Sequence, residues 1–246
     1  MTTCKFVPSR ETLLVVVPTY QERDNITLLC HQIIEVVPSC TILVIDDGSP
    51  DGTGAVVAQI GTIYPQVELL NRGHRRGIGS AHKAAMAIAK ARNFRVLVTL
   101  DADLTHNPQE IPNLLSALDT ADLAIASRFV PGGGLTDWPV WRRLLTHLGH
   151  LATRLLLGIP FDATGAFRAY RVEALSNSMP LALSDDYSFF FQSAKWFSQS
   201  KLQIVEVPIL LSARAFGSSK MKFSDVLRGL LNLALFSLTS KRRRRV

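Results

Sequence analysis

The sequence has few cysteines, charged residues and aromatic residues for its length. Of 246 residues, 3 are cysteines, 19% are charged and 8% are aromatic, while 47% are hydrophobic. Cys4, Cys30 and Cys40 are odd in number and lack C-x-x-C spacing. We therefore expect reduced thiols in a cytosolic protein, and neither a disulfide framework nor a zinc site. The apolar content excludes a disordered chain, and the length suffices for a hydrophobic core without cross-links.

Long hydrophobic runs are also missing. A membrane-spanning helix needs about 18 or more apolar residues in a row, and the nearest approach, Val226–Leu238, is interrupted by Arg228 and Asn232. Residues Met1–Arg10 lack the apolar stretch of a secretory signal. We expect a protein without a spanning helix of its own.

The positive charge is concentrated at one end. Of the formal net charge of +7, five positive charges lie in Lys241–Arg245, which leaves +2 for residues 1–240. A basic tail serves nucleic acid, anionic lipid or solubility alone. Composition does not choose among the three.

Short β-branched runs alternate with segments of helical spacing in the first half. The runs are Leu13–Val17, Thr41–Ile45, Val67–Leu70, Val96–Leu100 and Leu123–Ala126, and the helical segments are Ile26–Val37, Thr53–Ile60, Gly79–Arg92 and Pro108–Leu118. This alternation predicts βαβ units and a parallel sheet. The runs are mostly apolar and do not alternate with polar residues, as in strands covered on both faces. Ligands of such sheets bind beyond the carboxyl ends of the strands.

Polar residues follow four of these runs. They are Pro18–Glu22, Asp46–Thr53, Asp101–Asp103 and Ser127–Arg128. Carboxylates and an arginine at the same edge of the sheet suit a site that binds a metal ion through the carboxylates and an anion through the arginine. A D-x-D pair alone is common in solvated loops, but its position directly after a strand favours a Mg²⁺ or Mn²⁺ site completed by phosphate oxygens.

Three further segments contain residues typical of ligand-binding loops. A carboxylate in Asp46–Ser49 suits a ribose or a base, while the same residues build turns, with Asp51 or Thr53 capping a helix. Gly73–Ala81 lacks the ending of a Walker motif and does not fit G-x-G-x-x-G, which excludes a P-loop NTPase and a dinucleotide oxidoreductase. Arg214–Lys220, after a predicted strand at Ile204–Val207, suits a diphosphate or forms a surface loop.

Two segments of the second half have amphipathic helical spacing. Trp138–Ile159 combines apolar and basic residues, and its spacing alone favours a helix that packs on the core with a solvated basic face. Phe223–Leu238 is apolar except for one narrow polar stripe, which is typical of a core helix or of a membrane interface. The basic tail that follows favours the interface.

The ordered motifs resemble one known family. Pro-Thr-Tyr-x-Glu, Asp-Asp-Gly-Ser-Pro-Asp-Gly-Thr, Asp-Ala-Asp-Leu, Ser-Arg-x-x-x-Gly-Gly and Arg-x-x-Gly-x-Ser-Lys are similar to those of the polyprenol/dolichol-phosphate mannosyltransferases, family 2 glycosyltransferases with a GT-A fold. The resemblance implies an α/β fold, a Rossmann-like and mostly parallel sheet flanked by helices, with C-terminal amphipathic interface helices. We expect a GT-A domain at residues 1–220, and an amphipathic helix with a polybasic tail at residues 221–246.

The resemblance also implies roles for individual residues. The metal ligands would be Asp101 and Asp103, which hold Mg²⁺ or Mn²⁺ at the diphosphate and form the catalytic set with Arg128. The acceptor phosphate would contact Arg128, Arg142 and Thr146. The nucleotide would contact Pro18, Tyr20, Glu22, Val44, Asp46, Ala102, Arg214 and Lys220.

The implied reaction is an inverting, metal-dependent transfer of mannose from GDP-mannose to a polyprenyl or dolichyl phosphate. A lipid monophosphate, with a second pKa near ~6, is largely dianionic at neutral pH and needs no general base. The partners would be a nucleotide sugar, the lipid phosphate and an anionic membrane surface, but no nucleic acid, and a membrane-anchoring partner protein is an open option. The expected location is peripheral, on the cytoplasmic side of a membrane. The basic helix near Trp138–Ile159 and the C-terminal helix are the two candidates for this membrane contact.

Three alternatives remain open at this point. The nearest alternative is the same transfer to a lipid phosphate with UDP-glucose or another UDP-sugar as the donor. Transfer to a soluble or polysaccharide hydroxyl would need a general base, and none stands out. A non-catalytic or nucleic-acid-binding protein would explain the tail but not the D-x-D pair.

The sequence departs from the family pattern at several positions. The family's Gly-Tyr-x-Phe-x-x-Glu reads Asp186–Gln192 here, a loop lysine is Arg76, a helical asparagine is His150, and D-x-T-s-G-F-R reads Asp162–Arg168 with Gly and Ala in the middle. These departures lie outside the metal and diphosphate residues.

Overall fold

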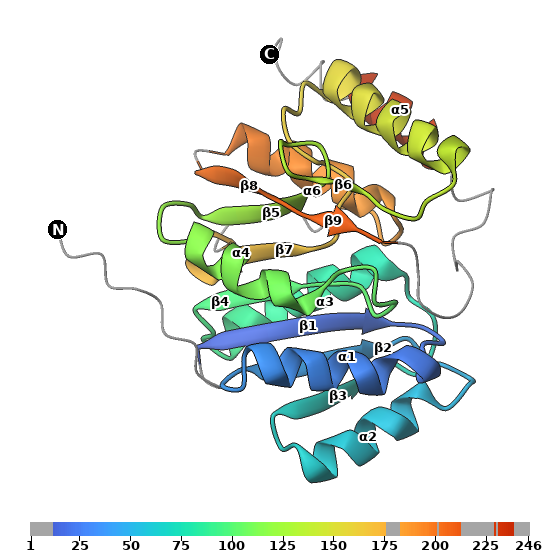
Figure 1. The fold of residues 1–246 in the computed structure, drawn as a ribbon, viewed down its shortest axis with the longest axis vertical. Coiled ribbons are helices and arrows are strands. Elements are labelled where there is room, and N and C mark those ends of the chain that lie inside the picture. The colour runs from blue at the N-terminus through green and yellow to red at the C-terminus, as the bar shows by residue number, and fades with distance from the viewer. Residues whose placement is uncertain (1–11, 176–182, 201, 213–228, 230, 239–246) are drawn as a thin grey trace, which may run out of the picture.

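The computed structural model describes residues 12–175, 183–200, 202–212, 229 and 231–238. Seven strands of these residues form one sheet in the order β3-β2-β1-β4-β7-β5-β8 (Figure 1). The strands are β1 (Leu13–Thr19), β2 (Thr41–Asp46), β3 (Val67–Asn71), β4 (Val96–Thr99), β5 (Leu123–Ser127), β7 (Arg168–Arg171) and β8 (Ile204–Pro208). A two-stranded sheet joins β6 (Gly134–Leu135) and β9 (Leu210–Leu211).

Helices cover both faces of the large sheet. The helices of the structure are α1 (Arg23–Val36), α2 (Thr53–Ile63), α3 (Ile78–Ala91), α4 (Ile111–Ala117), α5 (Val140–Leu157) and α6 (Ser188–Gln199), with short 3-10 turns η1 (Pro108–Glu110) and η2 (Val172–Leu175), and all but α5 pack on the sheet. In Figure 1, α1, α2 and α4 lie in front of the sheet, and α3 and α6 lie behind it. The predicted Rossmann-like α/β architecture is confirmed.

The central strand β1 explains why the predicted runs are mostly apolar and do not alternate with polar residues. All seven of its residues are buried. Leu13, Val15 and Val17 belong to the core on one face of the sheet, and Leu14 and Val16 belong to the core on the other. Because successive side chains of a strand point to opposite faces, a strand covered on both sides needs apolar residues at every position.

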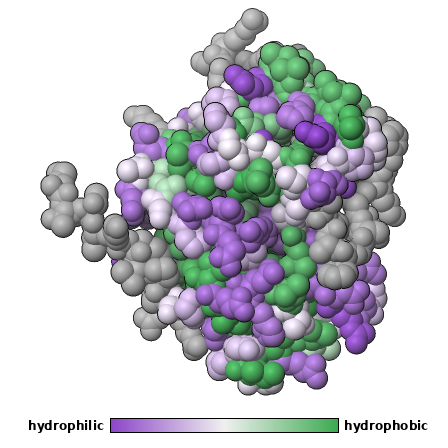
Figure 2. Space-filling model, in the orientation of Figure 1, coloured by the Kyte–Doolittle hydropathy of each residue, from purple (hydrophilic) through white to green (hydrophobic). Residues whose placement is uncertain are grey.

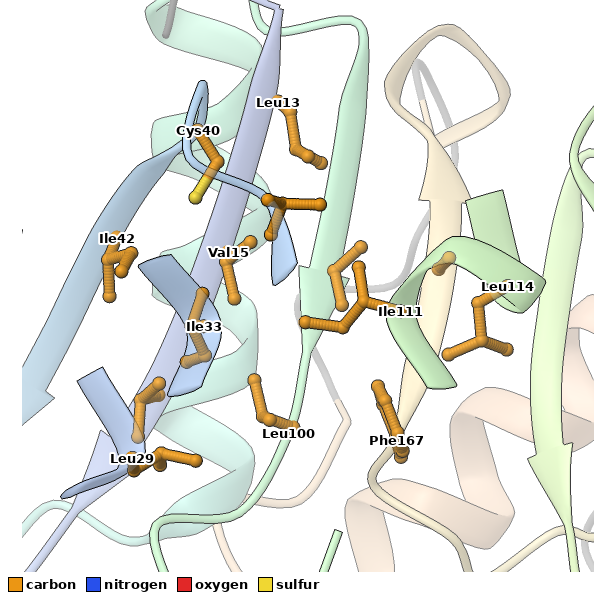
Figure 3. Packing of buried hydrophobic residues seen from close by; sticks show 14 of the residues in the cluster. Leu13, Val15, Leu29, Ile33, Cys40, Ile42, Leu100, Ile111, Leu114 and Phe167 are labelled. Atoms are coloured by element: carbon orange, nitrogen blue, oxygen red, sulfur yellow. The ribbon is translucent and has the colours of Figure 1, made fainter. Parts of the chain in front are cut away.

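Figure 3 shows how the helices close the core on the α1 side. Leu29 and Ile33 of α1 and Ile111 and Leu114 of α4 are fully buried against the sheet. Cys30 lies in the same core, where burial raises the pKa of its thiol to about 12. This thiol therefore stays protonated at neutral pH and packs as a small apolar residue.

Strand β7 is the exception to the parallel arrangement. It runs antiparallel to both β4 and β5, and the pattern of apolar runs did not predict it. Its four residues, Arg-Ala-Tyr-Arg, lack an apolar run. Arg168 is nonetheless 1% exposed, and its guanidinium donates to the carbonyls of Ala163 and Phe190 and to the hydroxyl of Ser193.

Helix α5 does not bury its apolar residues against the core. Leu144, Leu148 and Leu155 are 59%, 51% and 72% exposed, whereas Thr153 and Leu157 are the buried positions of this helix. The expectation of a core-packing helix with a solvated face is therefore wrong. Figure 2 shows the hydrophobic surface gathered over α5.

A helical segment near the C-terminus lies beside α5. Residues 231–238 are helical, and the Ser237 hydroxyl donates to the carbonyl of Leu156 at 2.9 Å. Leu233 is buried at 5% exposure, but Leu231 and Leu235 are 58% and 62% exposed. This segment therefore extends the exposed apolar surface of α5. Within the described residues, no helix is both long and apolar enough to span a membrane.

Candidate active site at the carboxyl edge of the sheet

Four strands end at one edge of the sheet, as the sequence predicted. Strands β1, β2, β4 and β5 point in the same direction, because β4 and β5 each pair antiparallel with β7. Their ends carry Tyr20, Asp46, Asp101 and Arg128. The reversed direction of β7 brings the loop before it, which contains Asp162, to the same edge.

The loops after β1 and β2 are tied together by hydrogen bonds. The amide of Gln21 donates to the Ser49 hydroxyl at 2.8 Å, and the amide of Glu22 donates to the Thr53 hydroxyl at 3.1 Å. Asp46 is 1% exposed and accepts the Ser49 amide at 3.0 Å. The turn interpretation of this segment is therefore correct, and it fixes the carboxylate of Asp46 at the strand end.

The expectation that Asp51 or Thr53 caps the next helix is wrong, because the N-cap of α2 is Gly52, in the left-handed conformation and without a side-chain capping hydrogen bond. The amide of Thr53 donates to Oδ1 of Asp51 at 3.0 Å, and the Thr53 hydroxyl donates to the same oxygen at 2.6 Å. Burial raises the pKa of Asp51, but these hydrogen bonds and one from Arg23 outweigh it and lower the pKa. Asp51 thereby anchors the start of α2.

Pro18, Tyr20, Glu22 and Val44, which are also predicted to contact the nucleotide, lie on these loops or beneath them. The guanidinium of Arg75 lies 4.9 Å above the ring of Tyr20, and Glu22 is 8% exposed and accepts from Asn25 at 2.6 Å. Pro18 is buried in β1. Val44 is fully buried in β2 and belongs to the core under this edge. Arg214 and Lys220 lie outside the described residues.

The glycine-containing loop before α3 is organised around Asp47. One carboxylate oxygen of Asp47 accepts the amides of Arg76 and Gly77 at 2.9 and 3.0 Å. The other accepts Nε of Arg72 at 2.6 Å, and both residues of this ion pair are buried. The backbone donors of the loop thus hold a carboxylate of the protein itself, which agrees with the rejection of a phosphate loop. No pattern in the sequence assigned this role to Asp47.

The segment before α6 closes against the start of α3. The amide of Gly79 donates to the carbonyl of Asp185 at 2.8 Å, and Lys83 pairs with the Asp185 carboxylate at 2.7 Å. Two residues that depart from the family pattern, Asp186 and Gln192, form hydrogen bonds in this segment. Asp186 accepts the Ser188 amide at 2.8 Å, at the start of α6, and Gln192 accepts the Ser184 amide at 2.8 Å.

The D-x-D turn after β4 is stabilised by hydrogen bonds with Thr105 and His106, the two residues that follow Leu104. Asp103 is 5% exposed and accepts both the amide and the hydroxyl of Thr105, at 3.1 and 2.6 Å. The amide of Asp101 donates to Nδ1 of His106 at 3.0 Å. The side chain of Asp101 is 33% exposed, which makes it the more accessible carboxylate, and Ala102 between them is 4% exposed.

His106 is buried within the site. Burial lowers the pKa of its imidazole to about 4, against the opposing effect of the Asp103 carboxylate. The ring is therefore neutral at pH 7, and its Nδ1 accepts a hydrogen bond. The 3.8 Å approach of this nitrogen to the Asp101 carboxylate is consequently not an ion pair at that pH.

The donor set of this turn suits a divalent cation that also contacts its substrate. Among the described residues, no group of three or more His, Cys, Asp or Glu side chains is arranged to hold a metal. Two carboxylates two residues apart provide a partial shell of hard oxygen ligands. Mg²⁺ bound by one or two carboxylates keeps its other positions for water and phosphate oxygens. Asp101 and Asp103 therefore fit Mg²⁺ or Mn²⁺ carried with a nucleotide diphosphate.

Arg128 is fixed beside this turn by a buried carboxylate. Its Nε and Nη2 each lie 2.8 Å from an oxygen of Asp162, and Nη2 also donates to the Thr164 hydroxyl at 2.6 Å. Burial would lower the pKa of Arg128, but the charges of Asp162 and Asp101 raise it above its ordinary value. Burial would raise the pKa of Asp162, but Arg128 and backbone donors hold it at about 2. The pair is ionised throughout the physiological range.

Helix α5 contacts the residue after Arg128. The imidazole of His150 stacks on Phe129 with ring centroids 3.9 Å apart, and His147 meets the same ring edge-on at 5.4 Å. Burial lowers the pKa of His150. Arg142 stacks on the Trp138 ring at 4.0 Å, and the Thr146 hydroxyl donates to the carbonyl of Arg142 at 2.9 Å. Two of the three predicted acceptor residues, Arg142 and Thr146, thus lie on the first turns of α5.

Comparisons with known proteins agree with this architecture. The profile of Glycosyl transferase family 2 matches residues 14–178. A polyprenol monophosphomannose synthase of Mycolicibacterium smegmatis is 39% identical over 240 residues, which are 95% of this chain and 89% of that protein. An undecaprenyl-phosphate mannosyltransferase of Micrococcus luteus is 36% identical over 232 residues, with 93% and 95% covered.

The fold is shared with a solved enzyme. The crystal structure of glucosyl-3-phosphoglycerate synthase from Mycobacterium tuberculosis, in complex with Mn²⁺, UDP and glucosyl-3-phosphoglycerate, matches with a TM-score of 0.62. The identity is 22%, and the match covers 93% of this chain and 79% of that one. At this identity the match concerns the GT-A fold alone. Together with the two close relatives and the family profile, it establishes that this chain belongs to glycosyl transferase family 2.

Proposed function

We propose that the protein transfers mannose from GDP-mannose to a polyprenyl or dolichyl phosphate at a membrane surface. The main observation behind the proposal is that Arg128, held by Asp162, lies beside the Asp101–Asp103 turn. A cation and two carboxylates therefore lie together at the carboxyl edge of the sheet. A site of this kind gathers two phosphate groups without repulsion. The names of the two close relatives, which state polyprenol monophosphomannose synthesis and undecaprenyl-phosphate mannosyl transfer, support the choice of sugar and acceptor.

We assign the donor diphosphate to the D-x-D turn and the nucleoside to the loops after β1 and β2. Asp101 and Asp103 would hold Mg²⁺ or Mn²⁺, which supplies positive charge for the leaving diphosphate. Glucosyl-3-phosphoglycerate synthase, which shares the fold, was crystallised with Mn²⁺ and UDP, and this supports a divalent metal. The nucleotide residues of this assignment are Pro18, Tyr20, Glu22, Val44, Asp46, Ala102, Arg214 and Lys220.

The acceptor phosphate is assigned to Arg128, with Arg142 and Thr146 on α5. The bidentate bond to Asp162 holds the guanidinium of Arg128 in one orientation, so it binds the acceptor phosphate without first losing side-chain freedom. A lipid monophosphate, dianionic above a second pKa of about 6, is itself a sufficient nucleophile. Its oxygen attacks C1 of the mannosyl group opposite the departing diphosphate, and the α-linked donor gives a β-linked product.

We propose that the exposed apolar face of α5 docks on the membrane. Leu144, Leu148 and Leu155 would enter the interface, while the arginines of the same helix would face the lipid headgroups. Residues 221–246, which contain Lys241–Arg245, would add an electrostatic attachment to residues 1–220. Such basic segments are attracted to the anionic cytoplasmic leaflet, and we place the enzyme there as a peripheral protein.

The contact between α5 and the candidate active site would place Arg128 near the membrane when α5 docks on it. Phe129 follows Arg128 directly in the sequence and stacks on His150 of α5. A membrane-bound α5 would therefore hold Arg128 close to the headgroup layer, where the phosphate of a polyprenyl phosphate lies. A lipid acceptor explains the position of the apolar surface better than a soluble acceptor does.

The donor and the metal are tested in one assay. The purified full chain is incubated with undecaprenyl phosphate in detergent and with radiolabelled GDP-mannose, UDP-glucose or UDP-galactose. We expect label in the organic phase with GDP-mannose, its loss with EDTA, and its recovery with Mn²⁺ or Mg²⁺. Transfer from a UDP-sugar alone would replace the donor assignment, and activity that persists in EDTA would contradict the metal assignment.

A further inference from the structure

We propose that His106 is a positioning residue that shapes the D-x-D turn for its metal through Nδ1. The inference rests on the proposed function, because it takes Asp101 and Asp103 as the metal ligands. It concerns a residue to which neither the family resemblance nor the strand-end pattern gave a role.

The amide of Asp101 lies just beyond the sheet. The last hydrogen bond from this end of β4 to β1 runs from the amide of Leu100 to the carbonyl of Val16 at 3.2 Å, and the pairing of β4 with β7 ends at Thr99. The next donor, the amide of Asp101, is taken by Nδ1 of His106 at 3.0 Å. His106 therefore continues the function of a strand partner where the sheet has ended.

The imidazole is itself held in place. Its side chain is 6% exposed, and its ring lies 5.3 Å from the ring of Phe167, a fully buried core residue. A rigid ring on the core is a better fixed point for the turn than a solvated loop.

The two carboxylates of the turn are thus fixed by different means. Thr105 binds the side chain of Asp103 directly, whereas His106 binds the backbone of Asp101 and leaves its side chain 33% exposed. The second arrangement sets the direction of the more accessible carboxylate without competing for its oxygens. Partners that orient metal ligands in this way typically change metal affinity by about 10–100-fold when they are removed.

The position of the acceptor atom provides a sharp test. His106→Asn keeps an acceptor at the δ position, His106→Gln moves the acceptor one bond further out, and His106→Leu keeps a branched side chain without an acceptor. Binding of Mn²⁺ to the full chain in the presence of GDP is measured from the electron paramagnetic resonance signal of free Mn²⁺. Thermal unfolding of each variant, measured separately, reports any loss of folded protein.

We expect His106→Asn to bind Mn²⁺ within about 3-fold of the wild type, and His106→Gln and His106→Leu to bind about 10-fold more weakly. Equal affinity of the leucine variant and the wild type would overturn the inference, as would equal weakening of all three variants. Asp101→Asn separates this result from the proposed function. If the wild type binds Mn²⁺ no better than Asp101→Asn does, the metal site itself is wrong, and the role of His106 is overturned with it.

Discussion

The Arg128–Asp162 ion pair is the interaction whose loss we expect to affect the protein most. Asp162 is fully buried and receives two hydrogen bonds of 2.8 Å from Arg128. Although burial raises the pKa of Asp162, the pair holds it at about 2, below the ordinary 3.8. At 1.36 kcal/mol per pKa unit, the folded state favours the ionised carboxylate by about 2.5 kcal/mol.

Breaking this pair from either side should be costly. We expect Asp162→Asn to lower the free energy of unfolding at pH 7 by about 3–5 kcal/mol, because the guanidinium of Arg128 is left buried without a counter-charge. Arg128→Met should cost a similar amount, since it leaves the carboxylate buried alone. The double variant should lose about 2–3 kcal/mol less than the sum of the two single losses.

Urea unfolding followed by tryptophan fluorescence measures these free energies. Asp119→Asn is the matched control, because Asp119 is exposed and its replacement should change stability by no more than about 0.5 kcal/mol. In the wild type, the contribution of Asp162 is present above pH 3.8 and is lost as the pH falls toward 2, and Asp162→Asn should lack this loss. Additive losses in the double variant would refute the view that the pair fixes Arg128.

Three further outcomes follow from single side chains. Gly48→Ala should cost several kcal/mol more than Gly52→Ala in urea unfolding, because both glycines have positive φ but only at Gly48 would a Cβ lie 2.6 Å from a backbone oxygen. Burial lowers the pKa of His82 to about 3. Below pH 6.5 His82 is therefore protonated in the unfolded chain but not in the folded chain, so the free energy of unfolding decreases. His82→Leu should reduce that slope between pH 6 and 5 by about 1 kcal/mol per pH unit, and an unchanged slope would contradict the assignment. Leu148→Glu should weaken sedimentation with anionic liposomes about 10-fold or more, whereas Ile63→Glu, at a 70% exposed position of α2, should not; equal effects would contradict docking through α5.

Much of the fold could be predicted because buried parallel strands leave a plain signal. The strands β1, β2, β4 and β5 are buried at every position and mostly apolar, since both faces of the sheet are covered. Strand β7 and helix α6 gave no such signal. The first is four residues long with an arginine at each end, and the second is buried around most of its circumference, which removes the contrast between faces.

The site residues that directly follow a strand could be predicted from the sequence. Residues that join the site through a partner far away in the sequence could not. Asp101, Asp103 and Arg128 follow apolar runs directly, so their shared edge could be predicted. Asp162 lies 34 positions after Arg128, and its position depends on the reversed direction of β7. The family-like segment around Asp162 was the only sign of importance in the sequence.

The orientation of α5 shows a different limit of prediction from the sequence. Helical spacing identifies an apolar stripe, but it does not say whether core or membrane covers that stripe. The structure excludes the core through exposed leucines such as Leu155, at 72%, and a membrane over this stripe is our proposal. The sequence carried one relevant clue, the cations interleaved with the apolar positions.

The chemical identity of the lipid product decides whether the proposed function is correct. The full chain is incubated with GDP-mannose, undecaprenyl phosphate and Mn²⁺, and the extracted lipid is analysed by mass spectrometry and by NMR of the anomeric carbon. We expect a single mannosyl group joined to the lipid phosphate in the β configuration. An α-linked product would contradict inversion at C1, and the absence of any mannosylated lipid phosphate would contradict the proposed function.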